Sequence, residues 1–369
     1  MPQPPASWKE LLGAHPQGDL ALKVLVLMKL GEPLLIVPAG QNARARDQLA
    51  LFPAQKLLAR LARFAWRWTL PLGFAPGGRK EMVRLDRSSA LGTFLGSLVR
   101  QEGWPQFVLL AGNPRAPGRR FLLLVFDANG HPAAVVKAGC DAAAAALIDQ
   151  EATFLEQSDG RIPGIPRLRA RFAHGITRAF ALDYVPGDSP GDEICKEMAQ
   201  LLNAWLRQDR RVRLGDLPAW QRLEAVSSGD AVFRQVAAMV AKLEVRPAVF
   251  HGDFAPWNVK VSPADGSWRV LDWERAVWED VPGWDWFHFR LQTALLVREQ
   301  NAAGLVNTAE ALLAHPAYQA YSAMCGTAGH DRAWLLAYLL HCRDVLQPVD
   351  GDGRVGELLN LLAQRWLKH

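Results

Sequence analysis

The sequence predicts an α+β protein in which a β-rich part precedes a helical part. Between residues 106 and 187, short apolar runs alternate with turn residues, a pattern typical of antiparallel hairpins. From about residue 188 to the end, apolar residues recur mainly at helical spacing, which predicts packed helices. A segment of about 105 residues with mixed strand and helix patterns precedes both parts.

Composition excludes several classes of protein. Of the 369 residues, 50% are hydrophobic and 21% charged, which excludes a wholly disordered chain. No apolar run reaches the ~18 residues of a membrane-spanning helix, and the first residues do not resemble a signal peptide. The four cysteines form no CxxC pair and are too scattered for a disulfide framework. We therefore expect a cytoplasmic protein.

The positive charge lies in the first third of the chain. Residues 1–105 contain 14 Lys and Arg against 7 Asp and Glu, whereas the remainder contains 28 against 30. The net charge of +5 therefore does not indicate nucleic-acid binding by the whole chain. Residues 53–68 predict an amphipathic helix with a basic stripe. Such a helix can contact an anionic membrane or a partner, or simply expose a solvated face, which is the simpler interpretation.

The individual elements follow from turn and breaker residues. In the first segment, two strands are expected around the turn at residues 29–32, followed by a helix that Pro71 ends. In the β-rich part, apolar runs bounded by turns predict strands at residues 107–111, 121–127, 133–138, 167–173 and 178–184. A helix is expected between the third and fourth of these strands, at residues 141–157.

Residues 249–274 interrupt the helical part with polar residues and short β-like runs. His251, Asp253 and Asn258 lie within eight residues, and Asp272 follows Asn258 by fourteen. Oxygen donors of this kind suit Mg²⁺, which prefers few protein ligands together with substrate phosphates. A carboxylate beside such a site can orient a hydroxyl nucleophile. The alternative is that these side chains only cap loops.

The two motifs His251-Gly-Asp-x4-Asn258 and Leu271-Asp-Trp-Glu274 resemble the active-site signature of the aminoglycoside phosphotransferase and choline kinase superfamily. This resemblance covers residues 106–290 and implies a two-lobed, protein-kinase-like fold. It implies a nucleotide-binding N-lobe at residues 106–187 and a catalytic, acceptor-binding C-lobe at residues 188–369. Residues 1–105 lie outside it, as a basic extension of unknown role.

The resemblance also implies roles for single residues in the C-lobe. Asp253 is expected to be the catalytic base, or the carboxylate that orients the hydroxyl. Asn258 and Asp272 are expected to bind Mg²⁺. His251 belongs to the catalytic loop, where a hydrogen-bonding role is expected rather than acid–base chemistry. Glu274 can contact substrate or support the loop.

Nucleotide contacts are implied for four residues of the N-lobe. Lys137 ends the third strand and resembles the phosphate-binding lysine, and Glu151 resembles its helix partner. Tyr184 and Val185 lie in the segment that resembles the adenine-binding linker. Taken alone, Lys137 can be an edge lysine that extends into solvent, and Glu151 a solvated helix residue.

One loop departs from the family pattern. Residues 112–118 contain two prolines and an arginine instead of GxGxxG, so Arg115, Arg119 or Arg120 can supply phosphate contacts instead. The donor is expected to be ATP, with GTP as an alternative.

The expected function is therefore phosphorylation of a small-molecule hydroxyl, with ATP and Mg²⁺. The last 80 residues hold no dense acidic cluster, whereas a polycationic aminoglycoside needs several carboxylates. This favours a sugar, an amino alcohol or a glycan-related metabolite as the acceptor. The alternative is a catalytically degenerate kinase-like module that binds nucleotide or a partner. His174, His288 and His341 lack metal-ligand spacing and are interpreted as core or surface residues.

Overall fold

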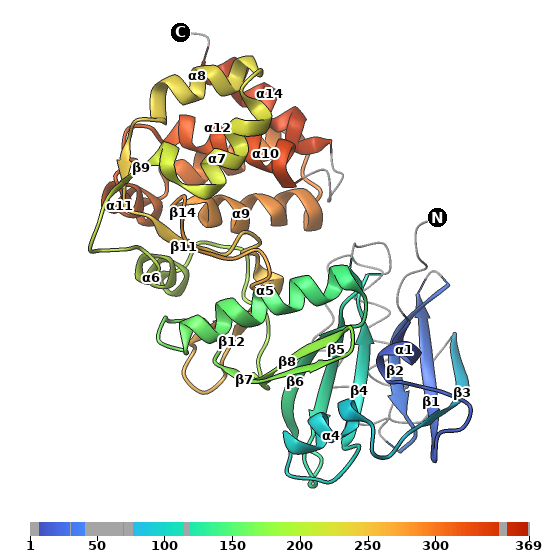
Figure 1. Cartoon of the computed structure of the whole chain (residues 1–369). Helices are drawn as coiled ribbons and strands as arrows, with labels where there is room; N and C mark the ends of the chain where they lie inside the picture. Colours follow the sequence, from blue (N-terminus) through green and yellow to red (C-terminus); the bar gives the residue numbers. More distant parts are fainter. Residues whose placement is uncertain are drawn as a thin grey trace. The chain divides into compact units, whose positions relative to one another are not determined.

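The chain divides into two compact units, which are described separately (Figure 1). The computed structural model describes residues 7–29, 31–40, 69, 77–113, 118–346 and 353–367. The first unit comprises Met1–Gly160 and Pro166–Val185, and the second comprises Arg161–Ile165 and Pro186–His369. The basic helix expected at residues 53–68 lies outside the described residues.

An eight-stranded antiparallel sheet organises the first unit. Its strands, in sheet order, are β3 (Gly78–Leu85), β1 (Leu20–Lys29), β2 (Glu32–Pro38), β4 (Gln106–Ala111), β5 (Phe121–Phe126), β6 (Pro132–Gly139), β8 (Thr177–Asp183) and β7 (Leu168–His174). The strands predicted between residues 107 and 184 are all present. Together with the helices of the second unit, they confirm the predicted α+β fold.

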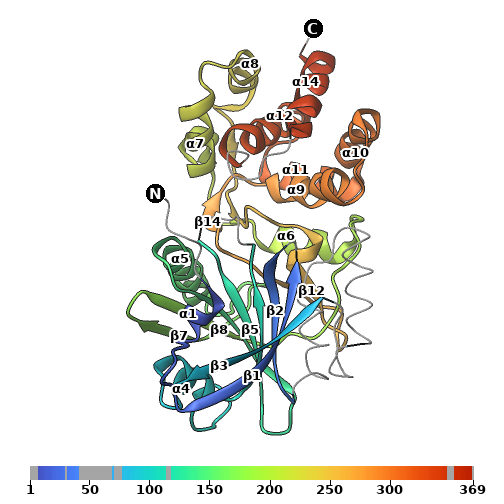
Figure 2. The ribbon, with the colours of Figure 1, turned by 90° about the vertical axis from the view of Figure 1, so that its right-hand side faces the viewer.

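Helices cover one face of this sheet (Figure 2). These helices are α1 (Trp8–Leu11), α4 (Ala90–Ser97) and α5 (Ala142–Ser158). Helix α5 begins where the Asp141 side chain accepts a hydrogen bond from the backbone N–H of Ala144, which satisfies one of the exposed amides of the first turn. It packs on β6, β7 and β8, so its inner face lies over the strands that were predicted to bind nucleotide.

The N-terminal segment contributes three strands to the same sheet. Strand β2 pairs with β4 through Leu35 opposite Leu110 and Ile36 opposite Leu109. One hydrophobic cluster includes Ile36 together with Leu109 and Leu123. The pairing satisfies the backbone of β4 along what is otherwise a sheet edge. Residues 1–105 and 106–160 therefore belong to one compact unit.

This shared core predicts that Ile36→Ala weakens strands outside the N-terminal segment. Ile36 is fully buried, and truncating a buried isoleucine costs about 2–5 kcal/mol. Native-state hydrogen exchange of the β5 and β6 amides should show this loss. Ile176→Ala is the matched control, because Ile176 is 55% exposed and its truncation should cost less than about 0.5 kcal/mol. Unchanged exchange in β5 and β6 would show that the N-terminal strands unfold independently.

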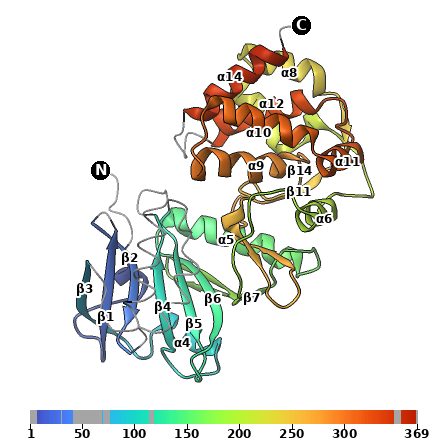
Figure 3. The same ribbon diagram turned by 180° about the vertical axis from the view of Figure 1, so that it is seen from behind.

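The second unit is mainly helical. Its helices are α6 (Lys196–Ala204), α7 (Pro218–Ser227), α8 (Ala231–Val240), α9 (Trp284–Gln292), α10 (Ala302–Ala314), α11 (Pro316–Cys325), α12 (Asp331–His341) and α14 (Arg354–Trp366). Helix α12 packs against α8, α9 and α14, and α10 packs against α9 and α14 (Figure 3). Among the described residues, no helix combines the length and apolar character needed to cross a membrane.

Short strands interrupt the helices of this unit. They are β9 (Val212–Arg213), β10 (Glu244–Val245), β11 (Ala248–Phe250), β12 (Val259–Val261), β13 (Trp268–Val270) and β14 (Val277–Asp280). They pair as β9 with β10, β11 with β14, and β12 with β13. Trp273, Trp284 and Trp286, which follow β13 and β14 in the chain, are fully buried, so these tryptophans belong to the hydrophobic core.

Candidate active site

The β12–β13 hairpin brings the two sequence motifs of the second unit together. Its register places Val259 opposite Val270, so Asn258 and Leu271 are neighbours at the same end. The backbone N–H of Leu271 donates to the carbonyl oxygen of Asn258 at 2.7 Å. Asn258 ends the 3₁₀ turn η4 (Pro256–Asn258), and Asp272 follows Leu271. The hairpin thus juxtaposes two residues that lie fourteen positions apart.

The buried side chain of His251 also links these two segments. Its Nδ1 accepts from the backbone N–H of Asp253 at 3.1 Å, and its Nε2 donates to the carbonyl oxygen of Leu271 at 3.0 Å. Burial lowers the pKa of His251 to about 4, so the ring is neutral at pH 7. Both ring nitrogens bind backbone, which fits the hydrogen-bonding role that was expected of this residue.

The side-chain amide of Asn258 bonds both the backbone and the side chain of Asp253. The Asn258 Nδ2 donates to the carbonyl oxygen of Asp253 at 2.9 Å and to its Oδ2 at 3.0 Å. These bonds assign the amide orientation and leave Oδ1 as the acceptor atom of Asn258. The Asp253 side chain remains 31% exposed, so its carboxylate can reach a substrate.

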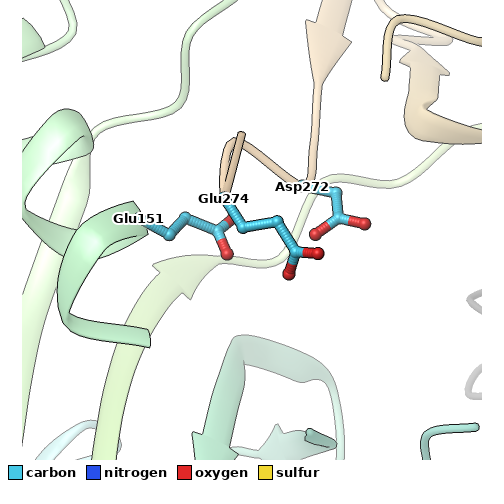
Figure 4. Close-up of side chains that lie close together, drawn as sticks. All are labelled: Glu151, Asp272 and Glu274. Atoms are coloured by element: carbon cyan, nitrogen blue, oxygen red, sulfur yellow. The ribbon is translucent and has the colours of Figure 1, made fainter. Parts of the chain in front are cut away.

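Asp272 adopts an uncommon backbone conformation. Its φ is +69°, in the left-handed region that aspartate tolerates better than most residues. Asp272 and Glu274 extend from the segment after β13 (Figure 4). Sparsely populated conformations concentrate at functional sites, where the surrounding structure maintains them. Here the Leu271 backbone N–H donates to Asn258 and the Leu271 carbonyl oxygen accepts from His251. These two bonds fix the backbone just before Asp272.

Asp285, near the start of α9, supports the loop from the other side. Its two carboxylate oxygens accept from the backbone N–H groups of His251, at 2.9 Å, and Gly252, at 3.2 Å. Burial raises the pKa of Asp285 to about 7, although both amides favour its ionised form. Gly252 has a φ of +78°, which a residue with a side chain rarely adopts.

His288, one helical turn after Asp285, reaches the carboxylate of Asp253. Its Nε2 lies 3.0 Å from Asp253 Oδ1, and its Nδ1 lies 3.1 Å from the Tyr338 hydroxyl. Neither His288 nor Tyr338 was identified from the sequence, and His288 was interpreted as a core or surface residue. Its spacing of three from Asp285 places both on one face of α9, which is the signal that could have identified His288.

His341 packs under the loop without joining this network. Its ring lies 4.7 Å from that of Trp284 and 6.3 Å from that of Phe250. Its Nδ1 has no hydrogen-bond partner among the described residues. Burial lowers the pKa of His341 to about 3, so the folded state keeps this ring neutral.

His341→Phe should flatten the dependence of stability on pH. In the unfolded chain, His341 takes up a proton below about pH 6.5, whereas in the folded chain it stays neutral down to about pH 3. Its contribution to stability is therefore lost as the pH falls, by at most about 1.4 kcal/mol per pH unit. Urea unfolding at pH 7 and pH 5 should show a loss that is smaller in the variant, by up to about 2 kcal/mol. Equal losses in both proteins would contradict this assignment.

In the first unit, Lys137 and Glu151 form a buried ion pair. Lys137 Nζ on β6 lies 2.6 Å from Glu151 Oε2 on α5. The lysine side chain is 12% exposed and the glutamate 2%, and the helical origin of Glu151 is visible in Figure 4. This burial excludes the interpretations of an edge lysine that extends into solvent and a solvated glutamate.

The other residues predicted to contact nucleotide have less distinctive surroundings. Tyr184 and Val185 directly follow β8 and are both partly buried. Tyr184 packs against the hydrophobic cluster of the sheet that includes Leu124 and Phe126.

The loop at residues 112–118 is only partly described, and Arg115 lies outside the described residues. Arg119 is buried, and its guanidinium donates to the carbonyl oxygens of Gly112 and Pro33. It therefore ties the loop to β2 instead of presenting its charge to solvent. This is at odds with the phosphate-contact hypothesis for Arg119.

Comparisons with known proteins agree with the sequence motifs. The model of the "Phosphotransferase enzyme family" matches residues 123–321, a range that contains Lys137, Glu151, the loop at residues 251–258 and Asp272. No curated protein matches this sequence.

The similar solved structures are distant in sequence. One is a thermostable mutant of aminoglycoside phosphotransferase APH(4)-Ia in a ternary complex with ADP and hygromycin B; the identity is 13%, the TM-score is 0.48, and the match covers 76% of this chain and 100% of that chain. Another is macrolide 2′-phosphotransferase MphH from Brachybacterium faecium; the identity is 16%, the TM-score is 0.42, and the match covers 69% of this chain and 91% of that chain. A third is choline kinase LicA from Streptococcus pneumoniae; the identity is 13%, the TM-score is 0.38, and the match covers 67% of this chain and 90% of that chain.

Proposed function

This chain belongs to the phosphotransferase enzyme family, and we propose that it transfers the γ-phosphoryl group of ATP to a hydroxyl group of a small molecule. The observation that carries this proposal is the convergence of Asp253, Asn258 and Asp272 at one end of the β12–β13 hairpin. A carboxylate that remains partly exposed beside two further oxygen-bearing side chains is suited to positioning a hydroxyl for phosphoryl transfer.

Asp253 acts on the acceptor. Its carboxylate accepts a hydrogen bond from the acceptor hydroxyl and orients an oxygen lone pair toward the γ-phosphorus. A bond forms between that oxygen and phosphorus while the bond from phosphorus to the β–γ bridging oxygen breaks. ADP leaves with the electron pair of the broken bond, and the hydroxyl proton passes to Asp253.

Asn258 and Asp272 are proposed to hold Mg²⁺. The donor set fits this ion, since Asn258 presents Oδ1 when its Nδ2 is bonded to Asp253, and Asp272 presents a carboxylate. Magnesium prefers such oxygen ligands in small number. When bound, the ion neutralises negative charge on the phosphates.

The first unit is proposed to bind the nucleotide. Lys137 contacts a phosphate, and Glu151 fixes the direction of the ammonium group by its 2.6 Å bond. Tyr184 and Val185 contact the adenine. His251 orients the catalytic loop and exchanges no proton, because both of its nitrogens are engaged by backbone.

The proposed acceptor is a sugar, an amino alcohol or a glycan-related metabolite. Residues 290–369 contain as many basic as acidic residues and no dense acidic cluster. A polycationic aminoglycoside needs several carboxylates to pair its ammonium groups, so these antibiotics are expected to be poor substrates.

An acceptor screen tests the proposal. The protein is incubated with Mg²⁺ and ATP, or GTP in parallel, and with single sugars, amino alcohols or aminoglycosides. ADP or GDP release is recorded, and mass spectrometry detects the phosphorylated acceptor. We expect one of the neutral or singly charged acceptors to gain one phosphoryl group with ATP. Efficient phosphorylation of aminoglycosides alone would overturn the acceptor class but not the reaction.

A further inference from the structure

The carboxylate of Asp253 is held at both oxygens. Asn258 Nδ2 donates to Oδ2, and the imidazole Nε2 of His288 lies 3.0 Å from Oδ1. Rotation about the terminal bond of an aspartate side chain is soft and nearly two-fold. One donor at each oxygen therefore fixes the plane of the carboxylate, and His288 supplies one of the two.

Helix α9 contacts three consecutive residues of the catalytic loop. Asp285 accepts from the amides of His251 and Gly252, and His288 reaches the side chain of Asp253. Residues three apart lie on the same helical face. The helix that holds the backbone of the loop thus also carries the group that orients its carboxylate.

Asp253 and Tyr338 on α12 bond the two ring nitrogens of His288 and together support one tautomer. A carboxylate only accepts hydrogen bonds, so Nε2 of His288 must be the protonated nitrogen. Nδ1 then accepts from the Tyr338 hydroxyl at 3.1 Å. Burial raises the pKa of Tyr338, which keeps that hydroxyl protonated. The His288 side chain is only 6% exposed, so little solvent is available to replace either bond.

We propose that His288, whose second ring nitrogen is bonded to Tyr338, is a positioning residue that holds the Asp253 carboxylate in the orientation that meets the acceptor hydroxyl. This inference rests on the proposed phosphotransferase function. It assigns His288 no contact with substrate and no transfer of a proton. Its effect is therefore expected on turnover rather than on nucleotide binding.

Three variants test this role, with ADP release as the readout. His288→Leu removes the donor and should lower kcat about 10²-fold, the cost of a small misplacement of a reacting group. His288→Gln places an N–H near the position of Nε2 and should restore kcat to within about tenfold of the wild type. Tyr338→Phe leaves the donor but removes the hydroxyl bonded to the other ring nitrogen, and should give an intermediate loss. The KM for ATP should stay within about twofold in all three, because no nucleotide contact is assigned to His288 or Tyr338. A general structural defect would change nucleotide binding as well.

His341→Phe is the matched control. His341 is also a buried histidine, lies three residues from Tyr338 on α12, and has no bond to Asp253. Its kcat at pH 7 should equal that of the wild type. A His288→Leu variant with wild-type kcat would overturn the inference, as would a loss in His288→Gln as large as that in His288→Leu.

A second measurement does not depend on knowing the acceptor. In protein labelled with ¹⁵N histidine, His288 should show the Nε2–H tautomer, and Tyr338→Phe should retain it with a changed Nδ1 chemical shift, since only the bond to Nδ1 is lost. An Nδ1–H tautomer in the wild type overturns the inference even if phosphoryl transfer is found. A wild type with the expected tautomer but without any phosphoryl transfer overturns the proposed function, and the role of His288 falls with it.

Discussion

Asp253→Asn should lower phosphoryl transfer by about 10³-fold, in line with the 10²–10⁴-fold contribution of a positioned acid–base group. The amide has almost the same shape as the carboxylate but cannot take the hydroxyl proton. Its NH₂ group would also face the Asn258 or His288 donors, which bind carboxylate oxygens in the native chain. Binding of ATP should persist, because no nucleotide contact is assigned to this residue. Single-turnover rates and ATP titrations on the same preparation separate the two effects.

Asp265→Asn is the control for this substitution. Asp265 lies in the turn between β12 and β13, and hydrogen bonds from serine side chains lower its pKa to about 2. It is thus an ionised aspartate on the same hairpin, away from the catalytic loop, and its loss should leave the rate unchanged. If Asp253→Asn changes neither rate nor binding, the chain is better described as a non-catalytic nucleotide- or partner-binding module.

Asp272→Asn should abolish the Mg²⁺-dependent part of nucleotide binding. Asparagine also tolerates the left-handed backbone found at this position, so the substitution removes a charge with little added strain. At 100 times its Kd, a ligand stabilises the wild type by about 2.7 kcal/mol. A 100-fold weaker complex would be stabilised by only about 0.4 kcal/mol at the same concentration.

Thermal unfolding with ATP, with and without Mg²⁺, measures this difference. The two proteins should behave alike with ATP alone and differ only when the metal is present. An equal Mg²⁺-dependent shift in both would place the metal ligands elsewhere in the chain.

The parts of the site that lie close together in the sequence could be predicted from it. His251, Asp253 and Asn258 share one loop, and a single hairpin joins them to Asp272. The pairing of Lys137 with Glu151 was implied by the family resemblance rather than by either residue alone, and the two side chains form a 2.6 Å pair.

Contacts between distant segments could not be predicted in the same way. His288 and Tyr338 are fifty residues apart, and each alone has the appearance of an ordinary core residue. Their role arises only when α12 packs against α9. The pairing of β2 with β4 was missed for a related reason, since apolar strand patterns show that a strand forms but not which strand it pairs with.

The proposed phosphotransferase function requires a working site for nucleotide and metal in this chain. A thermal-shift titration of the wild type with ATP and GTP, each with and without Mg²⁺, tests it most directly. We predict a stabilisation by ATP that requires Mg²⁺ and approaches about 2.7 kcal/mol at 100 times the Kd. No shift with either nucleotide, in the presence of Mg²⁺ and with the protein folded, would contradict the proposed phosphotransferase function.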